Sequence, residues 1–427
     1  MKLMNNNTGF AIKLLSASIA LSIATINSAN AAGLQLMPGS PNFGTAGAGH
    51  AALGEGAGAA WANPASMSLL EGNHLGIGII AAKTDIQFDA TDSSAESGGN
   101  AGGNVFLPSF SYVHSLSDDI KLGFSLVVPY GNDIAYDSDW TGNNVVTKTG
   151  MHTMQAMPSL SYRINDQLSL GGGITINHTQ VYQDLSPTVD INGSAPRGEI
   201  DLDLALEAES VDYGWTLGGL YEFNAQHRVG IVYRSGVESD LEGDADLFTE
   251  DLGGIDTTLD AELNWENASN IVISGYHEVN NEWAMMWDIG RTFYSEFEQT
   301  DIVASGLGDA PIVLEIERNW QDANRYAVGT HYKLNEKVTL QAGFSYDESV
   351  VTDEHRGVDL PLDDIKRYTI GTLYQATEKV QLGFGLEYAQ LGSGNIEAPE
   401  EGELLDSPQG SYESSAIATS FSMNYQF

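Results

Sequence analysis

Few stretches of this chain carry residues at a spacing that supports catalysis or metal binding. Residues 137–142, Asp-Ser-Asp-Trp-Thr-Gly, begin like a calcium-binding loop, but position 12 of that loop would be Lys148 in place of an acid. The glycine-rich stretches 44–49 and 54–58 lack the preceding strand and the following lysine of a phosphate-binding loop. The nine histidines have no metal-ligand spacing, and no Gly-x-Ser-x-Gly elbow occurs. The sequence therefore predicts no enzyme, no cofactor and no metal site.

Charge and cysteine content exclude further classes. The 18 Lys and Arg stand against 58 Asp and Glu, which gives a formal net charge of −40. Nucleic-acid binding needs a basic footprint, so this excess of acid excludes a nucleic-acid partner. Hydrophobic residues make up 42% of the chain and aromatic residues 9%, which argues against a disordered acidic chain. The absence of cysteine excludes a disulfide scaffold and a thiolate zinc site.

The first residues resemble an export signal. Lys2 and Lys13 precede an apolar stretch at 14–26, and Ala29-Asn30-Ala31 supplies the small residues of a cleavage site. The apolar stretch is too short for a membrane-spanning helix, and no later stretch is expected to supply one. We therefore expect a signal peptide at residues 1–31, followed by two regions at 32–74 and 75–427.

The region 32–74 is rich in Gly, Ala, Ser and Asn and has no period-2 pattern. Asn63 followed by Pro64 predicts a helix start, with Asn63 as the N-cap and Pro64 at the first helical position. From residue 75 onward apolar and small or polar residues alternate, for example over 168–177, 213–223 and 380–389. This alternation predicts β-strands with two different faces, as in either a soluble sandwich or a membrane barrel.

The connections decide between these two folds. Short polar turns are expected at 117–119, 165–166, 224–225, 280–281, 335–336 and 377–378. Long acidic, glycine-rich loops are expected at 89–104, 137–149, 183–210, 242–256, 299–318, 352–363 and 392–410. Short turns at one rim and long loops at the other are typical of transmembrane β-barrels, with the short turns in the periplasm. Strands on both sides of seven long loops predict a fourteen-stranded antiparallel barrel with both chain ends periplasmic, and Trp283, Trp287, Tyr332, Tyr346 and Tyr388 are expected in its interfacial girdles.

Particular residues resemble the FadL family of outer-membrane transporters of hydrophobic compounds. They are the expected mature start at 32–36 (Ala-Gly-Leu-Gln-Leu), the triplet Asn63-Pro64-Ala65, the segments 162–165, 274–276 and 283–284, and the aromatic C-terminus. The resemblance implies an all-β fourteen-stranded barrel closed by a small N-terminal hatch at 32–74, with Asn63, Pro64 and Ala65 in the gate. The alternating aromatic residues of the last strand, 421–427, are similar to the signal read by the barrel-assembly machinery.

The resemblance also implies a transport route. Cargo would land among the long outer loops, bind in a lumenal site touched by Leu34 and Leu36, and leave sideways where the third strand kinks. The third strand is expected at 121–136 and contains Pro129, Tyr130 and Gly131. A proline and a glycine within a strand indicate a bulge or kink. The alternatives are that Gly131 only relieves crowding, that Asn63 is only a helix cap, and that Leu34 and Leu36 belong to a loosely held chain end.

Alternation turns several residues toward the lumen. Arg234 and Arg325 are expected to point inward, where either could hold a carboxylate or pair with lumenal acids such as Asp288, Asp347 and Glu387. The apolar lumen candidates are Val127, Met157 and Met286. The basic positions that the family uses for a fatty-acid head group align with Leu185 and with Gln321 or a neighbour of it, so a fatty acid is only one cargo to consider beside alkanes and aromatic hydrocarbons.

We therefore predict a passive outer-membrane channel for hydrophobic small molecules that acts as a monomer. The alternative is a general diffusion porin or a surface-receptor barrel, and a hydrolase with carboxylates in its outer loops is a further one. Acids in those loops, for example Asp240, Asp359 and Glu400, would lie beside anionic lipopolysaccharide. One hypothesis is that divalent cations bridge these acids to lipopolysaccharide phosphates.

Overall fold

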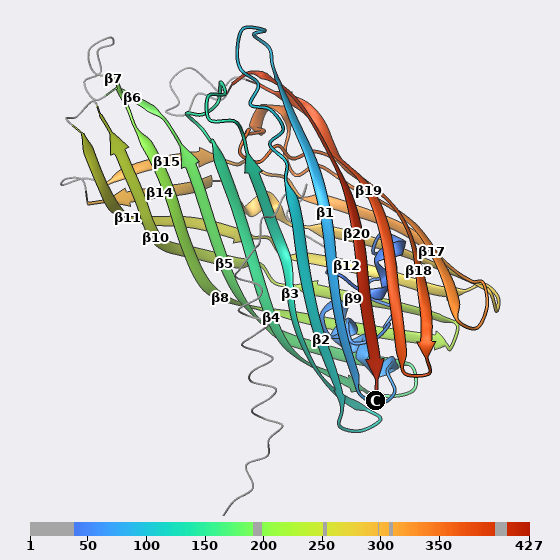
Figure 1. The fold of residues 1–427 in the computed structure, drawn as a ribbon. Coiled ribbons are helices and arrows are strands. Elements are labelled where there is room, and N and C mark those ends of the chain that lie inside the picture. The colour runs from blue at the N-terminus through green and yellow to red at the C-terminus, as the bar shows by residue number, and fades with distance from the viewer. Residues whose placement is uncertain (1–37, 191–198, 251–253, 298, 307–310, 398–407) are drawn as a thin grey trace, which may run out of the picture.

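A computed structural model describes residues 38–190, 199–250, 254–297, 299–306, 311–397 and 408–427, and Figure 1 shows a barrel around a short helical segment. Within the described residues, no helix has the length and apolarity needed to cross a bilayer. The strands are β1 (His74–Ala90), β2 (Asn104–Ser115), β3 (Ile120–Ala135), β4 (Lys148–Arg163), β5 (Leu168–Leu185), β6 (Thr188–Asp190), β7 (Glu199–Asp201), β8 (Asp203–Asn224), β9 (His227–Arg234), β10 (Val237–Thr249), β11 (Ile255–Asn267), β12 (Asn270–Glu278), β13 (Trp283–Thr292), β14 (Gln299–Ser305), β15 (Ile312–Glu317), β16 (Ala323–Lys333), β17 (Val338–Asp347), β18 (Ile365–Thr377), β19 (Val380–Ile396) and β20 (Gly410–Gln426). The helical turns are η1 (Pro41–Thr45), α2 (Ala59–Ala62), η2 (Pro64–Leu69), η3 (Tyr294–Glu296) and η4 (Asp353–His355).

The barrel wall contains fourteen antiparallel strands, which confirms the prediction. Four of them are interrupted, so each of the pairs β9 and β10, β11 and β12, β13 and β14, and β15 and β16 forms one long strand. The first and last strands close the barrel, because β1 pairs with β20 from His74 opposite Gln426 to Ala90 opposite Gly410. Closure therefore leaves no open sheet edge at this seam. An open edge would be unfavourable in a membrane, because its backbone groups would have no hydrogen-bond partners.

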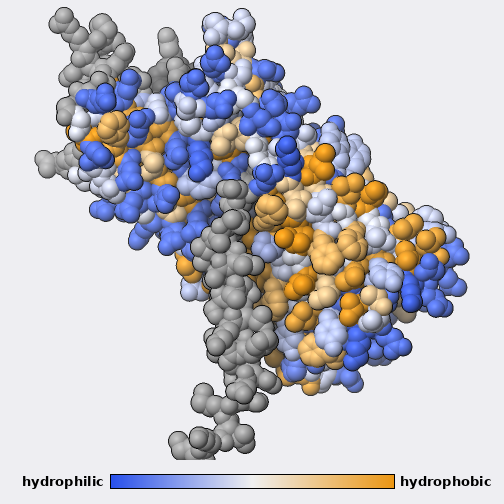
Figure 2. Space-filling view, viewed as in Figure 1, coloured by the Kyte–Doolittle hydropathy of each residue, from blue (hydrophilic) through white to orange (hydrophobic). Residues whose placement is uncertain are grey.

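The outward face of β8 changes character along its length. Its first outward residues include Asp203, Glu207 and Glu209, whereas from Val211 to Phe223 they are mostly apolar or aromatic and exposed. At about 3.3 Å per residue and a tilt of about 40°, this apolar stretch covers roughly 30 Å along the barrel axis, enough for a lipid-facing band of about 25 Å. On the face that Figure 2 shows, hydrophilic residues cover the upper left part, apolar residues gather over the lower right part, and hydrophilic residues return along its right edge.

The strands extend well beyond this apolar band, and here the sequence prediction is partly wrong. Loops are expected over 183–210, 242–256 and 299–318, but strands run into all three segments: β8 into the first, β10 and β11 into the second, and β14 and β15 into the third. The physical reason is visible on β10, where exposed acids alternate with the buried Leu241, Ala245 and Leu247. Charged residues at every second position satisfy a strand whose outer face contacts water, so a high acid content does not by itself indicate a loop.

The segment 38–73 lies inside the barrel, near the end that carries the C-terminus (Figure 1). We call this segment the hatch. It contains η1, α2 and η2, and its apolar residues are buried against the wall, among them Ala48, Ala52, Ala60, Ala65 and Met67. The predicted signal peptide and the lumen candidates Leu34 and Leu36 lie outside the described residues.

The hatch approaches the wall closely where inward-facing residues are glycines. A Cβ added at Gly218 on β8 would lie 1.9 Å from Asn63 Oδ1, and one added at Gly230 on β9 would lie 1.9 Å from the carbonyl oxygen of Ala51. No side chain fits at either distance. The missing Cβ atoms therefore provide the space in which the hatch backbone packs on the strands.

Adjacent glycines on β8 test this packing. We expect Gly218→Ala to lower the stability of the hatch by about 1–3 kcal/mol, because its methyl group overlaps Asn63. Gly219→Ala is the matched control, since its Cβ would point away from the hatch and lie 3.3 Å from the Ile231 side chain. Limited proteolysis of the hatch in purified, folded barrels measures the difference. Equal protease resistance in both variants would contradict the packing account.

Candidate functional site

Asn63 links three parts of the structure. Its Nδ2 donates to the carbonyl oxygens of Ala51 at 2.6 Å and of Gly219 at 3.1 Å, and its Oδ1 accepts from the Ala65 amide at 3.0 Å. Asn63 thus caps η2, with Pro64 at the first position, as its sequence context predicts. The side chain is fully buried, so it also joins the hatch to β8 without access to water.

Three arginines of the wall bind backbone carbonyls of the hatch. Arg228 donates to Ala52 and Leu53 at 2.7 and 2.9 Å. Arg234 donates to Trp61 and Ala62 at 3.1 and 2.9 Å, and its guanidinium lies 4.6 Å from the centre of the Trp61 indole. Arg325 donates to Ala46 at 2.6 Å. These charge-assisted bonds satisfy carbonyls that the short helical turns leave without partners.

His50 of the hatch faces two of these arginines. Burial first, and then the charges of Arg234 and Arg325, lower the pKa of His50 well below its ordinary value. The ring is therefore neutral, and its Nε2 accepts a hydrogen bond from Arg234 Nη2 at 3.1 Å. Trp61 packs edge-on against the same ring, with centroids 5.3 Å apart. A protonated His50 would be a third cation at this place and would repel both guanidinium groups, so the neutral ring favours the packing.

A compensated charge cluster lies on β16, β17, β18 and β19. Asp347 pairs with Arg325 at 2.7 Å and also with Arg367. Arg367 lies 3.9 Å from Glu387. Two arginines thus meet two carboxylates inside the barrel, and the four side chains are only 14–19% exposed. Pairing of this kind offsets the cost of burying each charge.

A cavity of about 140 Å³ lies between the hatch and the wall. Its apolar lining comes from hatch residues such as Phe43 and Trp61 and from wall residues on β1, β2, β3, β19 and β20; the wall residues are Ile80, Ala82, Val105, Leu107, Val127, Ala389, Leu391, Ala416 and Ala418. Polar groups reach it from His50, Glu55 and Arg367, among others. The arrangement, mostly apolar with a few polar groups, is typical of a small-molecule site.

The wall beside this cavity is interrupted between β2 and β3. Among the described residues, the ladder between these strands ends at Phe110 opposite Leu126. Beyond that point β2 pairs with β1 and β3 pairs with β4, where the register shifts between Val127 and Tyr130. All six residues from 127 to 132 are buried, so the alternation of inner and outer faces stops here. The two strands that lose their pairing both contribute to the cavity lining, through Val105, Leu107 and Val127.

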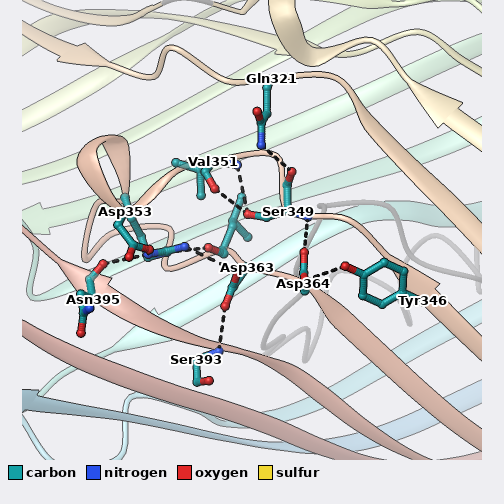
Figure 3. A network of polar contacts seen from close by, with 11 residues as sticks. Gln321, Tyr346, Ser349, Val351, Asp353, Asp363, Asp364, Ser393 and Asn395 are labelled. Atoms are coloured by element: carbon teal, nitrogen blue, oxygen red, sulfur yellow. Dashed lines mark hydrogen bonds and ion pairs between the residues drawn. The ribbon is translucent and has the colours of Figure 1, made fainter.

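The connection between β17 and β18, residues 348–364, reaches across the barrel. Its Val358 carbonyl accepts from the Tyr136 hydroxyl at 3.0 Å, just after β3, and its Asp359 pairs with Arg318 at 2.8 Å. Arg356 is buried and donates to the Leu362 and Asn395 carbonyls, both at 2.8 Å. Figure 3 shows further polar contacts of this connection, among them those of Asp363 with Ser393 and of Asp364 with Ser349 and Tyr346. Its apolar side chains also enter two buried clusters, so it lies over part of the lumen.

The lumen residues predicted from the sequence lie in different parts of the structure. Val127 lines the cavity, Met157 packs with Trp61 and Val127, and Met286 packs against the hatch. Arg234 and Arg325 contact the hatch, as described above. Pro129, Tyr130 and Gly131 lie in the buried stretch of β3.

Sequence reasoning missed several residues that line the cavity, among them Phe43, Trp61, Ile80, Leu107 and Arg367. Trp61, the only tryptophan between residues 38 and 73, could have been noticed from the sequence. The contacts of the wall residues depend on pairing between distant strands.

Comparison with known sequences gives a consistent family match. A family model described as "Outer membrane protein transport protein (OMPP1/FadL/TodX)" matches residues 20–427. The long-chain fatty acid transport protein of Shigella flexneri is 26% identical over 392 residues, covering 81% of this chain and 84% of that protein. Outer membrane protein P1 of Haemophilus influenzae is 26% identical over 374 residues, covering 78% and 80% of the two chains.

Solved structures give the same fold. A Pseudomonas aeruginosa FadL homologue superposes with a TM-score of 0.85 at 20% identity, covering 93% of this chain and 100% of that chain. The P. putida toluene transporter TodX superposes with a TM-score of 0.74 at 19% identity, covering 92% and 99%. At these identities the likeness supports the fold alone.

The buried ion pair between Arg318 and Asp359 is expected to stabilise the connection at residues 348–364. Asp359→Leu leaves Arg318 buried without its partner and should destabilise the connection by about 3–5 kcal/mol. Asp322→Leu is the control, because it removes the partner of the partly exposed Arg291 and should cost less than about 1 kcal/mol. Amide hydrogen exchange of residues 349–364 measures the effect. Unchanged protection in Asp359→Leu would contradict it, and Arg318→Met added to Asp359→Leu should restore protection in part.

Proposed function

The chain belongs to the OMPP1/FadL/TodX family of outer membrane transport proteins, and we propose that it is a passive channel that takes up small hydrophobic molecules and releases them sideways into the bilayer between β2 and β3. Proteins similar to it range from a long-chain fatty acid transport protein to a toluene transporter. The cargo is therefore apolar. A fatty acid carries a carboxylate and toluene carries no charge, so the charge on the cargo distinguishes the two.

One observation carries this proposal: the apolar cavity lies beside the interrupted ladder of β2 and β3. Continuing their register beyond Phe110 and Leu126 would set Pro108 opposite Val128 and Leu107 opposite Pro129. Proline has no backbone N–H and cannot donate to a ladder, so prolines on both facing strands disfavour pairing at this place. The interruption thus follows from the sequence of the two strands.

Lateral release suits an apolar molecule. A sideways exit leads from an apolar cavity to the hydrocarbon region of the bilayer, so the cargo never has to enter periplasmic water. The hatch fills the barrel at the short-turn end, where a water-filled porin would need an open path. In this proposal the short turns and both chain ends face the periplasm, and the strand extensions carry their acids at the cell surface. Bridging of these acids to lipopolysaccharide by divalent cations stays a prediction.

Uptake measurements test the function. Cells that carry the protein should take up labelled toluene, an alkane or a long-chain fatty acid faster than cells that lack it, with no requirement for an energised membrane. An ion current through the purified protein in planar bilayers, with no gain in uptake of any of the three, would instead favour the porin alternative.

The exit has its own test. Pro108→Val together with Pro129→Val restores the two backbone donors, so β2 and β3 should pair further and uptake should fall toward that of cells without the protein. Pro158→Val is the matched control, because Pro158 is exposed on β4, opposite Phe124 of β3, and is not part of the β2–β3 ladder, so uptake should be unchanged. Folded barrels are first verified by their heat-dependent gel mobility. Full uptake in the folded double variant would refute lateral release at this place.

A further inference from the structure

The six short turns of the described chain share one geometry. In each, a Ser, Asn or Thr side chain accepts a hydrogen bond from the backbone N–H three residues later. The donating residues are Ile120, Leu168, His227, Trp283, Val338 and Val380. Five of the six are apolar or aromatic, as expected where barrel strands leave a bilayer. His227, at the start of β9, is the exception.

The level of His227 in the bilayer follows from the residues beside it. The residues three positions before the same capping side chains are His114, Tyr162, Tyr221, His277, Tyr332 and Tyr374. Tyr162, Tyr221 and Tyr374 are exposed. A ring of exposed tyrosines marks the headgroup level of a membrane. His277 belongs to this ring and lies directly opposite His227 in the pairing of β12 with β9, so both imidazoles lie at the headgroup level.

Both histidines lie on the outer face of the wall. Arg228 follows His227 and binds the hatch, so the alternation of β9 turns His227 outward. His277 is paired with Met285 of β13, whose side chain is 47% exposed, whereas the next residue, Met286, packs against the hatch. Each imidazole is only partly buried. The pair is therefore open to lipid and lies apart from the cargo cavity.

The hydrogen bonds of the pair determine where each ring carries its proton. The indole N–H of Trp287 donates to Nε2 of His277 at 3.2 Å, and an indole nitrogen can only donate. His277 Nε2 is therefore an acceptor, which leaves the proton of this ring on Nδ1. His277 Nδ1 lies 3.3 Å from Nδ1 of His227, so the first donates and the second accepts. The proton of His227 is then on Nε2.

The three side chains form a chain of donors that ends at His227. It runs from Trp287 through His277, and each bond polarises the next, which strengthens the last donor. Nε2 of His227 points away from His277 and has no hydrogen-bond partner among the described residues. At the headgroup level of a bilayer, the strongest acceptors are the phosphodiester oxygens of phospholipids.

The same chain argues against a metal ion at this pair. Two nitrogens that bind one zinc ion tetrahedrally at about 2.0–2.1 Å lie roughly 3.3 Å apart, so the distance alone would allow zinc. If His277 Nδ1 bound the metal, however, Nε2 would carry the proton. That proton would face the N–H of Trp287. Trp287 therefore favours the hydrogen-bonded chain over metal coordination.

We propose that His227, with its proton held on Nε2 by His277 and Trp287, binds the phosphodiester group of a phospholipid in the leaflet at the short-turn rim. His227 contacts the lipid, and His277 and Trp287 are positioning residues. The acyl chains of this lipid lie along the exposed apolar surface of β9 and β13, which includes Ile231 and Ile289. The site is on the outer surface, so it does not depend on the identity of the cargo.

Native mass spectrometry of the folded full chain, released from detergent micelles at neutral pH, tests the site. The probes are phosphatidylglycerol and diacylglycerol with the same acyl chains, which lacks the phosphate. Phosphatidylglycerol should bind more tightly. His227→Phe keeps an aromatic ring but loses the N–H group, so it should weaken phosphatidylglycerol about tenfold and change diacylglycerol less than about twofold. His114→Phe is the matched control, because His114 belongs to the same ring on β2, beside Tyr112, and should change neither lipid.

Unchanged phosphatidylglycerol binding in His227→Phe, or an equal loss in His114→Phe, would overturn the proposed site. Displacement of the phospholipid by an excess of inorganic phosphate would assign the donor to a free anion and overturn the lipid as its ligand.

The positions of the protons have a separate test, in which zinc is the probe. Trp287→Phe frees His277 Nε2 to carry the proton, so both Nδ1 atoms become available to a metal. This variant should bind zinc about tenfold more tightly than the unmodified protein, and His277→Phe added to it should abolish the gain. Equally tight zinc binding with and without Trp287 would overturn the positioning role of Trp287.

Discussion

The structure depends on satisfying the backbone of a segment that has few polar side chains of its own. The hatch is rich in glycine and alanine and lies inside the barrel, so many of its N–H and C=O groups are shut off from water. An unpaired backbone group in such a place costs about 1–3 kcal/mol. The wall supplies the partners: Arg228 and Arg234 bind carbonyls, while Asp288 and Ser274 accept from the amides of Gly49 and Ala51 at 2.7 and 2.8 Å. The same constraint explains why lumenal arginines contact the hatch.

This mode of attachment has a consequence for transport. Each contact is a separate hydrogen bond or a small apolar surface, and the glycines of the wall contribute no side chains that interlock with the hatch. The cavity is bounded on one side by the hatch, through Phe43 and Trp61, and on the other by the strands beside the β2–β3 interruption. A small shift of the hatch therefore changes the shape of the cavity next to the proposed exit. In this account cargo binding and release are linked through the hatch.

The sequence predicts the barrel well because its signals are local. Alternation and turn residues are read within about ten positions, and they predict fourteen strands and the cap at Asn63. The prediction of a loop at 242–256 was wrong because it followed the high acid content of this segment and not its period-2 alternation. Leu241, Ala245 and Leu247 already mark an inner face. The pairing of Arg325 with Asp347 is one of the alternatives that the sequence offers. The bonds of Arg234 and Arg325 to carbonyls of the hatch could not be predicted, since each depends on how a distant segment packs in the lumen. The cavity could not be predicted for the same reason, because its walls come from residues near both ends of the chain.

The central claim is that cargo binds between the hatch and the first three strands, beside the interrupted ladder. Crystals of the protein soaked with bromobenzene, with the bromine located by its anomalous scattering, test this claim most directly. The account predicts a bromine site in the cavity bounded by Ile80, Leu107 and Val127. Bromine found only on the lipid-facing surface or among the outer strands β10 and β11, with none in the cavity, would contradict it.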